Sequence, residues 1–374
     1  MSNENQIKLK EQIENDINAG LALKEKEFAL HKSKIERNYE DFKKKQEELK
    51  ASESITIGEV EPDYYERLAR ENEEYMLLAQ NSPSFLNIDK DLSNSIPYFA
   101  RNIILIGAES GNGKSTIAGN LAFQTILQQK KILMITNEEI DTDVFNRVTC
   151  LLRGWPYTNH KEFTLEQRQE FARMYPILGR NMTVISDYFN KVGGTTTTIE
   201  GVIGVLKKTL NSPVEYDAII IDYFQNISVS NAGLNIDEWK VLDKFAKFLD
   251  SYRKVSKSPI VLLSQLKQSS EANPLPFKER IERSKSIYNV STCSVEVKAN
   301  REDYSTSFKI HKSRFPDAVG KEIVVGFKKG RYVEYNDEYK SEVNSKKSQK
   351  LIMEESKRHV DLLKGIMKKN EPVN

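Results

Sequence analysis

Cysteine is scarce in this sequence, with only Cys150 and Cys293 among 374 residues. Two thiols cannot build a disulfide framework or a cysteine-rich metal cluster, so both are expected to be buried, reduced side chains. Long apolar runs are also missing. No stretch is long enough to cross a bilayer, and the N-terminus carries no secretory signal. We therefore expect a cytoplasmic protein with no membrane partner.

A strong net charge of either sign is absent as well. The 56 Lys and Arg residues are nearly balanced by 54 Asp and Glu residues, which leaves a formal net charge of +2. A surface that binds nucleic acid must therefore come from local basic loops, because the chain as a whole is not basic. The length allows one large domain with extensions, or two domains.

The two ends of the chain are richer in charge than its middle. Residues 1–55 are predicted to be a charged helical segment, in which an apolar residue recurs at every seventh position: Leu21, Phe28, Ile35, Phe42 and Leu49. Half of a heptad stripe indicates a solvated helix or, alternatively, a coiled coil or partner-docking helix. Residues 56–98 are predicted to be a helical linker, with a helix over 64–80 and a turn signal at 81–84. Residues 337–374 are predicted to be a charged tail.

The middle of the chain, residues 99–336, alternates short apolar runs with helical patterns. Strands are predicted at 103–106, 132–135, 182–185, 218–221 and 260–263. This alternation is typical of a parallel sheet that helices cover on both faces, an α/β fold. After Asn289 the pattern changes to consecutive strands, which predict a β-rich extension of the sheet: 293–298, 305–311, 323–327 and 332–335.

The first predicted strand runs directly into a glycine-rich turn. Residues 107–116 read Gly-Ala-Glu-Ser-Gly-Asn-Gly-Lys-Ser-Thr and precede a helical pattern over 117–129. Glycines let backbone N–H groups converge on phosphate oxygens at the positive end of a helix. Lys114 can reach the β and γ phosphates, and the Ser115 hydroxyl can bind Mg²⁺. A turn that binds no phosphate is the alternative, but such turns rarely have Gly-Lys-Ser at a helix start.

The sequence therefore predicts a site for ATP, or another nucleoside triphosphate, together with Mg²⁺. The residues expected to surround the phosphates are Ala108, Glu109, Ser110, Gly111, Asn112, Gly113, Lys114, Ser115 and Thr116.

Polar residues also follow three other predicted strands, and the carboxyl ends of parallel strands meet at the phosphate edge of the sheet. Asp222 ends the strand over 218–221, where a carboxylate can hold Mg²⁺ through water. Glu138 and Glu139 follow the strand over 132–135, where a carboxylate can deprotonate an attacking water. Acidic residues that merely favour a helix start are the alternative there. Gln265 ends the fifth strand, where its amide could sense the γ-phosphate.

These strand-end segments resemble the successive motifs of the DnaB-like replicative helicases, in order and at similar spacings. The segments are Gly107 to Thr116, Thr136-Asn137-Glu138-Glu139, Ile221-Asp222-Tyr223-Phe224-Gln225 and Leu263-Ser264-Gln265-Leu266. The likeness spans residues 85–335. In that family Ala is frequent at the first phosphate-loop position, where this chain has Ala108. The resemblance implies a RecA-like P-loop NTPase that assembles as a hexameric ring around single-stranded DNA and hydrolyses NTP at subunit interfaces.

The resemblance also implies roles for individual residues. Lys114 would bind phosphate, Ser115 and Asp222 would hold Mg²⁺, and Glu138 would be the catalytic base. Gln265 would link the γ-phosphate to the DNA loops.

A further element resembles the family's Lys-x-Arg segment. It reads Ile-His-Lys-Ser-Arg over residues 310–314. Arg314 would then act as an arginine finger on the nucleotide of the neighbouring subunit, with Lys312 beside it. Two cations that solvate the end of a strand are the alternative.

Contacts with DNA are expected from residues 267–285, a stretch interrupted by two prolines. Its predicted phosphate-binding cations are Lys267, Arg280, Arg283 and Lys285. Such backbone contacts give salt-sensitive binding that is independent of base sequence. The family's Arg-Glu-Ser-Gly element corresponds here to residues 283–287 but is one residue short. A basic loop that is only solvated is the alternative.

We therefore predict an ATP-dependent replicative DNA helicase of compact, viral type, which translocates 5′ to 3′ as a ring in bacterial cytosol or a virus-infected cell. A charged helix stands where the family carries a globular helical domain or a primase. The N-terminal helices are therefore expected to contact a loader, primase or polymerase. A RecA-, RadA- or KaiC-like ATPase or recombinase is the first alternative. A non-enzymatic ATP-binding scaffold is the second, and Glu138 and Gln265 argue against it.

Overall fold

The computed structural model describes residues 64–157, 162–186, 198–222, 238–269, 274–281 and 285–347. The charged segment predicted over 1–55, the part of the predicted charged tail beyond residue 347, and Arg283 lie outside these residues. The chain divides into two units, residues 1–72 and 73–374, each of which is considered by itself. Helix α2 (Tyr64–Asn81) begins in the first unit and continues into the second, and it confirms the helix predicted over 64–80.

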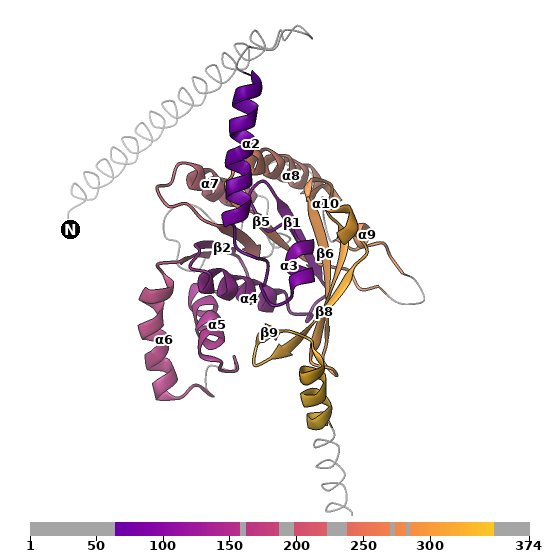
Figure 1. The fold of residues 1–374 in the computed structure, drawn as a ribbon. Coiled ribbons are helices and arrows are strands. Elements are labelled where there is room, and N and C mark those ends of the chain that lie inside the picture. Colours follow the sequence, from indigo (N-terminus) through magenta and orange to yellow (C-terminus); the bar gives the residue numbers. More distant parts are fainter. Residues whose placement is uncertain are drawn as a thin grey trace, which may run out of the picture. The chain divides into compact units, whose positions relative to one another are not determined.

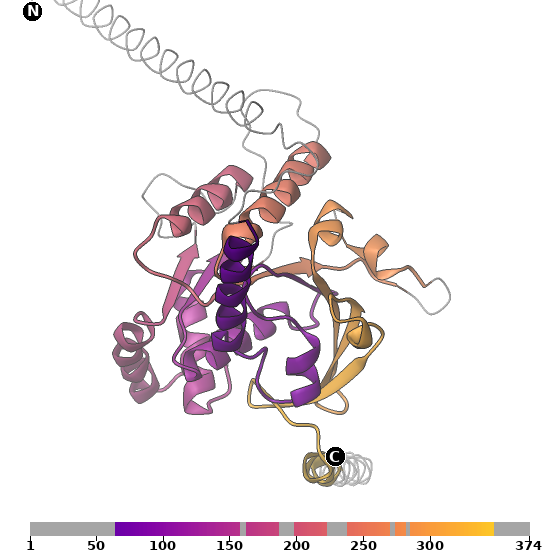
Figure 2. The ribbon, with the colours of Figure 1, turned by 45° about the horizontal axis from the view of Figure 1, so that its top comes forward.

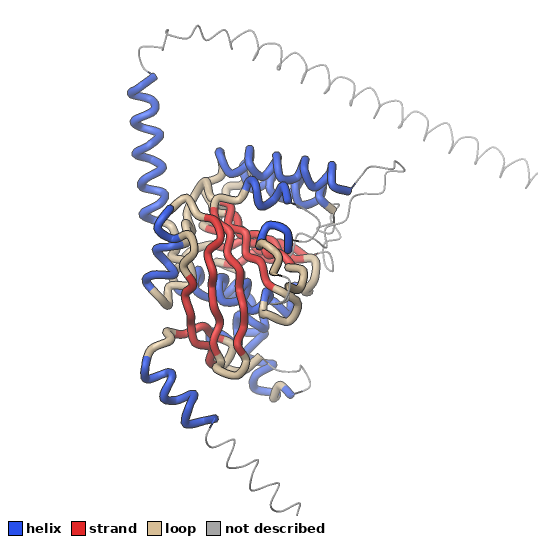
Figure 3. The backbone as a smooth tube through the Cα atoms, turned by 90° about the vertical axis from the view of Figure 1, so that its right-hand side faces the viewer, coloured by secondary structure: helices blue, strands red, loops and turns tan. Residues whose placement is uncertain are grey.

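A nine-stranded sheet forms the centre of the second unit, in the order β3-β2-β4-β5-β1-β6-β7-β8-β9 (Figure 3). The parallel strands are β1 (Ile103–Ala108), β2 (Ile132–Thr136), β3 (Met182–Ser186), β4 (Ala218–Asp222), β5 (Ile260–Gln265) and β6 (Cys293–Asn300). The strands β7 (Ser305–Lys312), β8 (Glu322–Lys328) and β9 (Arg331–Val333) continue the sheet in antiparallel fashion. The predicted parallel sheet and its β-rich extension are thus confirmed.

Helices cover both faces of this sheet (Figures 1 and 2). The helices are α3 (Lys90–Ser95), α4 (Lys114–Leu127), α5 (Asp141–Arg153), α6 (Leu165–Leu178), α7 (Ile199–Leu210), α8 (Glu238–Val255), α9 (Phe277–Arg280) and α10 (Lys285–Val290). A short 3₁₀ turn, η3, spans Pro316–Ala318, and residues 337–347 are helical. Among the described helices, none is both long and apolar enough to span a membrane.

The core has two layers because successive side chains of a strand point to opposite faces. In β1, Ile104 and Ile106 join an apolar cluster with α3, α4 and α5, whereas Ile103 and Leu105 join one with α7 and α8. The β1 side chains that face the two layers are buried, which explains why this strand reads as a continuous apolar run. Cys150 and Cys293 are free and buried, as expected, and burial raises the pKa of Cys150 to about 11.

A buried amide joins the antiparallel extension to helix α4. Asn120 Nδ2 donates to the carbonyl of Gly330 at 2.9 Å, and its Oδ1 accepts from the backbone N–H of Tyr332 at 3.0 Å. Asn120 is 1% exposed, so these two backbone groups, at the turn into β9, depend on it for hydrogen bonds. The helix that follows the glycine-rich turn is thereby fixed to the far end of the sheet.

We predict that Asn120→Ala lowers the free energy of unfolding, because it leaves a part-buried carbonyl and a buried N–H without this hydrogen-bond partner. Each unsatisfied group costs about 1–3 kcal/mol. Urea unfolding followed by circular dichroism measures the change. Asn94→Ala, at an exposed position of α3, serves as the control and is expected to stay within about 0.5 kcal/mol of wild type. An equal stability of the two variants would contradict the assigned role of Asn120.

Candidate nucleotide-binding site

The glycine-rich turn leads from β1 into α4 through two residues with left-handed backbone. Gly111 has φ 77° and Gly113 has φ 86°, values that favour glycine because a Cβ strains this conformation. Gly113 is the N-cap of α4, which therefore begins at Lys114, at the Gly-Lys-Ser element where the sequence placed a helix start. A glycine cap offers no side chain to the first-turn N–H groups, so they can bind an anion.

The carboxyl edge of the sheet brings the predicted acidic residues together. Asp222 ends β4 opposite Thr136, the last residue of β2. Burial and, to a smaller extent, the nearby carboxylates of Glu139 and Glu138 raise the pKa of Asp222 to about 7, although Lys114 opposes this shift. Asp222, Glu138, Glu139 and Lys114 come from three separate stretches of the sequence, and their charges interact at this edge.

The residues at this edge suit a magnesium ion. A buried carboxyl whose pKa is raised by like charges gains stability when a cation binds beside it. Ser115, in the first turn of α4, supplies a hydroxyl next to Lys114. Within the described ranges there is no group of three or more His, Cys, Asp or Glu side chains that could hold a metal ion. One carboxylate and one hydroxyl fit Mg²⁺, which keeps several waters and binds substrate phosphates.

The two glutamates after β2 differ in their surroundings. Glu139 is half-buried and forms an ion pair with Arg147 on α5; burial raises its pKa despite that partner. Glu138 is exposed, and its backbone N–H donates to Thr136 Oγ1 at 3.4 Å. The side chain of Glu138 therefore lies at the surface of the site, whereas Glu139 is engaged within the fold.

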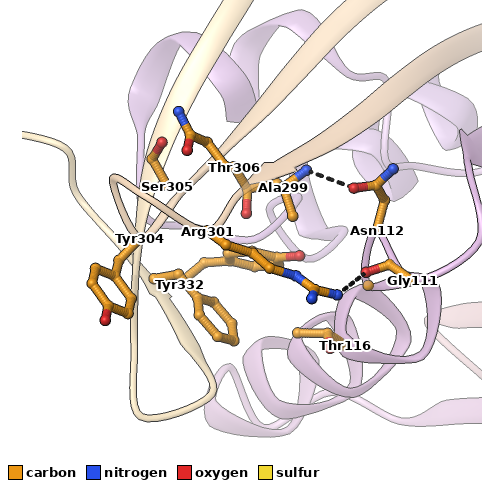
Figure 4. A pocket seen from close by; sticks show the side chains of 12 residues that line it. Gly111, Asn112, Thr116, Ala299, Arg301, Tyr304, Ser305, Thr306 and Tyr332 are labelled. Atoms are coloured by element: carbon orange, nitrogen blue, oxygen red, sulfur yellow. Dashed lines mark hydrogen bonds between the residues drawn. The ribbon is translucent and has the colours of Figure 1, made fainter.

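A cavity of about 440 Å³ adjoins the glycine-rich turn and was not predicted from the sequence. Residues 111–113 and Thr116 form one wall, and Arg301, Tyr304 and Tyr332 contribute to the other (Figure 4). The Arg301 guanidinium donates to the Gly111 carbonyl at 3.4 Å. Aromatic rings and a guanidinium suit a planar base next to its phosphates. No motif marks these residues, because the β6–β7 turn, which carries Arg301 and Tyr304, and β9, which carries Tyr332, reach the site only in the folded chain.

Two predicted residues lie far from this edge within the subunit. Lys312 ends β7, which runs antiparallel to β6, so it faces the opposite edge of the sheet from the phosphate loop. Its Nζ donates to the carbonyls of Tyr288 and Asn289 at 2.8 and 3.0 Å. Burial and neighbouring cations, among them Arg314, lower its pKa. Arg314 itself is exposed just beyond the strand.

The predicted DNA-binding cations divide into two kinds. Lys267 and Lys285 are exposed, as a phosphate contact requires. Arg280 differs from the prediction, because it is 4% exposed and its guanidinium donates to Glu109 and to Glu296, each at 2.5 Å. The Arg280 cation is buried and paired with two carboxylates, so it is not accessible to a DNA phosphate. Gln265 ends β5 opposite Ala108, between the phosphate loop and Lys267.

Comparisons with known proteins agree with this arrangement. The model of the family described as DnaB-like helicase C terminal domain matches residues 87–305. A solved structure of an isolated ATPase domain is similar with a TM-score of 0.56 and 14% identity, over 74% of this chain and 100% of that one. A DnaB-like replicative helicase, studied with its primase, is similar with a TM-score of 0.51 and 15% identity, over 64% of this chain and 58% of that one.

No curated protein matches the chain. At these identities the solved structures show the fold alone, and they confirm the predicted RecA-like α/β architecture. The family match shows more than the fold, because it extends over more than half of the sequence. The chain therefore belongs to the DnaB-like helicase C-terminal domain family, whose members are replicative helicases driven by nucleoside triphosphates.

Proposed function

We propose that this chain is a replicative DNA helicase that hydrolyses ATP, assembles as a hexameric ring, and translocates 5′ to 3′ on single-stranded DNA to unwind the duplex at a fork. One observation carries the proposal. Lys114, Glu138 and Asp222 meet at one edge of the sheet, whereas Arg314 lies at the opposite edge. A site completed by a second subunit requires an assembly.

The nucleotide is held by three groups of residues. Residues 108–116 bind the phosphates with backbone N–H groups, and Lys114 neutralises the β and γ phosphates. Ser115 and Asp222 hold Mg²⁺, which neutralises charge on the phosphates when it is bound. The base and ribose occupy the cavity beside Arg301, which is half-enclosed by Tyr304 and Tyr332. ATP fits these groups, although any nucleoside triphosphate shares the phosphate contacts.

Hydrolysis uses one residue from each of two subunits. Glu138 takes a proton from the attacking water, a role supported by its exposed position beside Asp222 and Lys114. Arg314 of one subunit stabilises the negative charge that develops on the nucleotide of its neighbour, with Lys312 beside it. Gln265 relays the presence of the γ-phosphate to the segment that begins at Lys267.

DNA and partner proteins bind elsewhere on the molecule. Lys267 and Lys285, with Arg283 between them in sequence, contact the phosphate backbone of single-stranded DNA. Helix α2 exposes apolar side chains, among them Met76 and Leu77, and none of its residues is buried. We assign contacts with a loader, primase or polymerase to the N-terminal helices. The family match favours this helicase function over the recombinase alternative.

We predict that Lys114→Ala and Glu138→Gln each lower DNA-stimulated ATP hydrolysis by at least about a hundredfold, the range expected for loss of a general base or a phosphate contact. Lys114→Ala also weakens nucleotide binding, whereas Glu138→Gln retains it. Phosphate release with single-stranded DNA measures the rate. Glu139→Gln is the matched control, because Glu139 is paired with Arg147. If Glu139→Gln is inactive and Glu138→Gln is active, the catalytic base has been misassigned.

We predict that Arg314→Ala lowers turnover by roughly a thousandfold, as for other arginine fingers, while nucleotide binding is kept. Mixing Arg314→Ala with Lys114→Ala subunits restores part of the activity, because some interfaces then combine an intact lysine with an intact arginine. Hydrolysis rates of mixtures at varied ratios test this. Lys321→Ala, an exposed cation nearby, is the control. Normal hydrolysis by an Arg314→Ala ring would refute the assignment.

A further inference from the structure

A buried ion-pair network connects the phosphate loop to the segment that carries Lys267. At its centre is Arg280, whose side chain is 5% exposed. The guanidinium donates to Glu109 in the phosphate loop and to Glu296 in β6, and its Nε donates to the carbonyl of Lys267 at 3.1 Å. One side chain therefore bonds to three stretches of chain that are separate in sequence. The planar fork of an arginine suits such a junction because its donors point in fixed directions.

Glu109 holds both ends of the 266–281 segment. Its carboxylate accepts from Arg280 at one end, and from the backbone N–H of Ser269, at 3.4 Å, near the other. The two ends are themselves joined, since the N–H of Lys267 donates to the carbonyl of Arg280 at 2.8 Å and Leu266 forms a β-bridge with Ile281. The described part of the segment is thus tied at its base to one phosphate-loop side chain.

The segment also packs directly on the start of the phosphate loop. A Cβ on Gly107 would come within 2.8 Å of the Leu266 side chain and 2.9 Å of Phe277, so the absence of a side chain there permits the contact. A backbone shift in the phosphate loop would therefore be felt by the segment through van der Waals contact as well as through charge.

The other side of the network is anchored in the sheet. Burial would raise the pKa of Glu296, but hydrogen bonds with His311 and Arg280 outweigh it and hold this pKa at about 2. His311 Nε2 lies 2.9 Å from Glu296 Oε2, and its ring stacks on Phe277 with centroids 4.5 Å apart. Because Glu296 is paired with Lys309 in the ladder between β6 and β7, it is a fixed partner, whereas Glu109 belongs to a loop that a ligand can move.

We propose that Arg280 is a positioning residue that couples nucleotide binding to the grip of the 266–281 segment on single-stranded DNA. The inference rests on the proposed function and adds to it a link that is separate from Gln265. A bound triphosphate brings negative charge to the loop, which makes the Glu109 carboxylate more dependent on its cationic partner. The Glu109–Arg280 bond then strengthens relative to the Glu296–Arg280 bond, and Lys267, whose carbonyl accepts from Arg280, shifts with it toward the phosphate loop.

The experiment measures a coupling factor, the ratio of Kd values for a fluorescent oligo-dT without and with a non-hydrolysable ATP analogue and Mg²⁺. The full chain is used. We expect a factor of roughly fivefold or more for wild type, the lower range for coupled sites. In Arg280→Met and in Glu109→Ala the factor falls to near one. Arg280→Lys gives an intermediate factor, because an ammonium keeps the charge but not the fork.

Lys267→Ala is the matched control, since it removes an exposed cation from the same segment but keeps the backbone groups of residue 267 that bond to Arg280. It should weaken DNA binding equally with and without the analogue, so the coupling factor stays at the wild-type value. The slope of log K against log salt concentration should fall by about one. If Arg280 had a purely structural role, Arg280→Met would not lose the coupling factor selectively while Lys267→Ala keeps it.

Two outcomes overturn the inference and are distinguishable. A wild-type coupling factor in Glu109→Ala refutes it while the helicase proposal stands. This variant is decisive even if Arg280→Met fails to fold, because Glu296 still pairs with Arg280 and the Glu109 side chain is 25% exposed. A wild-type chain that binds no oligo-dT, or binds it with no response to the analogue, refutes the proposed function and the inference together.

Discussion

The parallel alignment of β1, β2, β4 and β5 is the constraint on which the rest of the structure depends. Strands that share a direction end at the same edge, so residues far apart in sequence become neighbours there. Asp222 lies opposite Thr136, and Gln265 opposite Ala108. A slip of one residue in any strand would turn its terminal side chain to the other face of the sheet. The two apolar layers prevent such slips, and the site therefore depends on side chains that touch no ligand.

The same alignment concentrates negative charge at one edge. Asp222 is buried close to Glu138 and Glu139, and only Lys114 and Arg147 oppose the repulsion among the groups that shift its pKa. A triphosphate alone would add to this repulsion, whereas a triphosphate with Mg²⁺ offsets it. The electrostatics of the edge thus favour the two ligands together over either one. The reversal of direction at β7 has the opposite effect, because it removes the cation of Arg314 from the edge, and the proposed role of Arg314 on a neighbouring subunit rests on this reversal.

The strands and the polar residues at their ends were predictable, because the spacing of apolar residues and the residue type that follows each apolar run can be read locally in the sequence. Other features depend on distant partners. Arg280 belongs to a basic, proline-containing stretch and was expected at the surface, but it is paired with carboxylates 171 and 16 residues away. Arg301 and Tyr304 lie in an ordinary turn whose importance comes from its contact with the phosphate loop. The start of α4 at Lys114 was predictable, because Gly-Lys-Ser after a glycine-rich turn marks a helix start.

The energetics of burying Arg280 favour a role in positioning the chain over a role in stabilising the fold. Removing two carboxylates and a guanidinium from water costs several kcal/mol per ion, and their attraction offsets this only when the geometry is good. An apolar cluster of similar volume would hold the fold as well, so stability alone does not explain the network. The ion pairs of Arg280 change in strength when a charged ligand binds nearby, whereas the contacts of an apolar cluster do not. Since Gln265 precedes the 266–281 segment and Arg280 bonds to Lys267 at its start, the described ends of the segment are held together at its base.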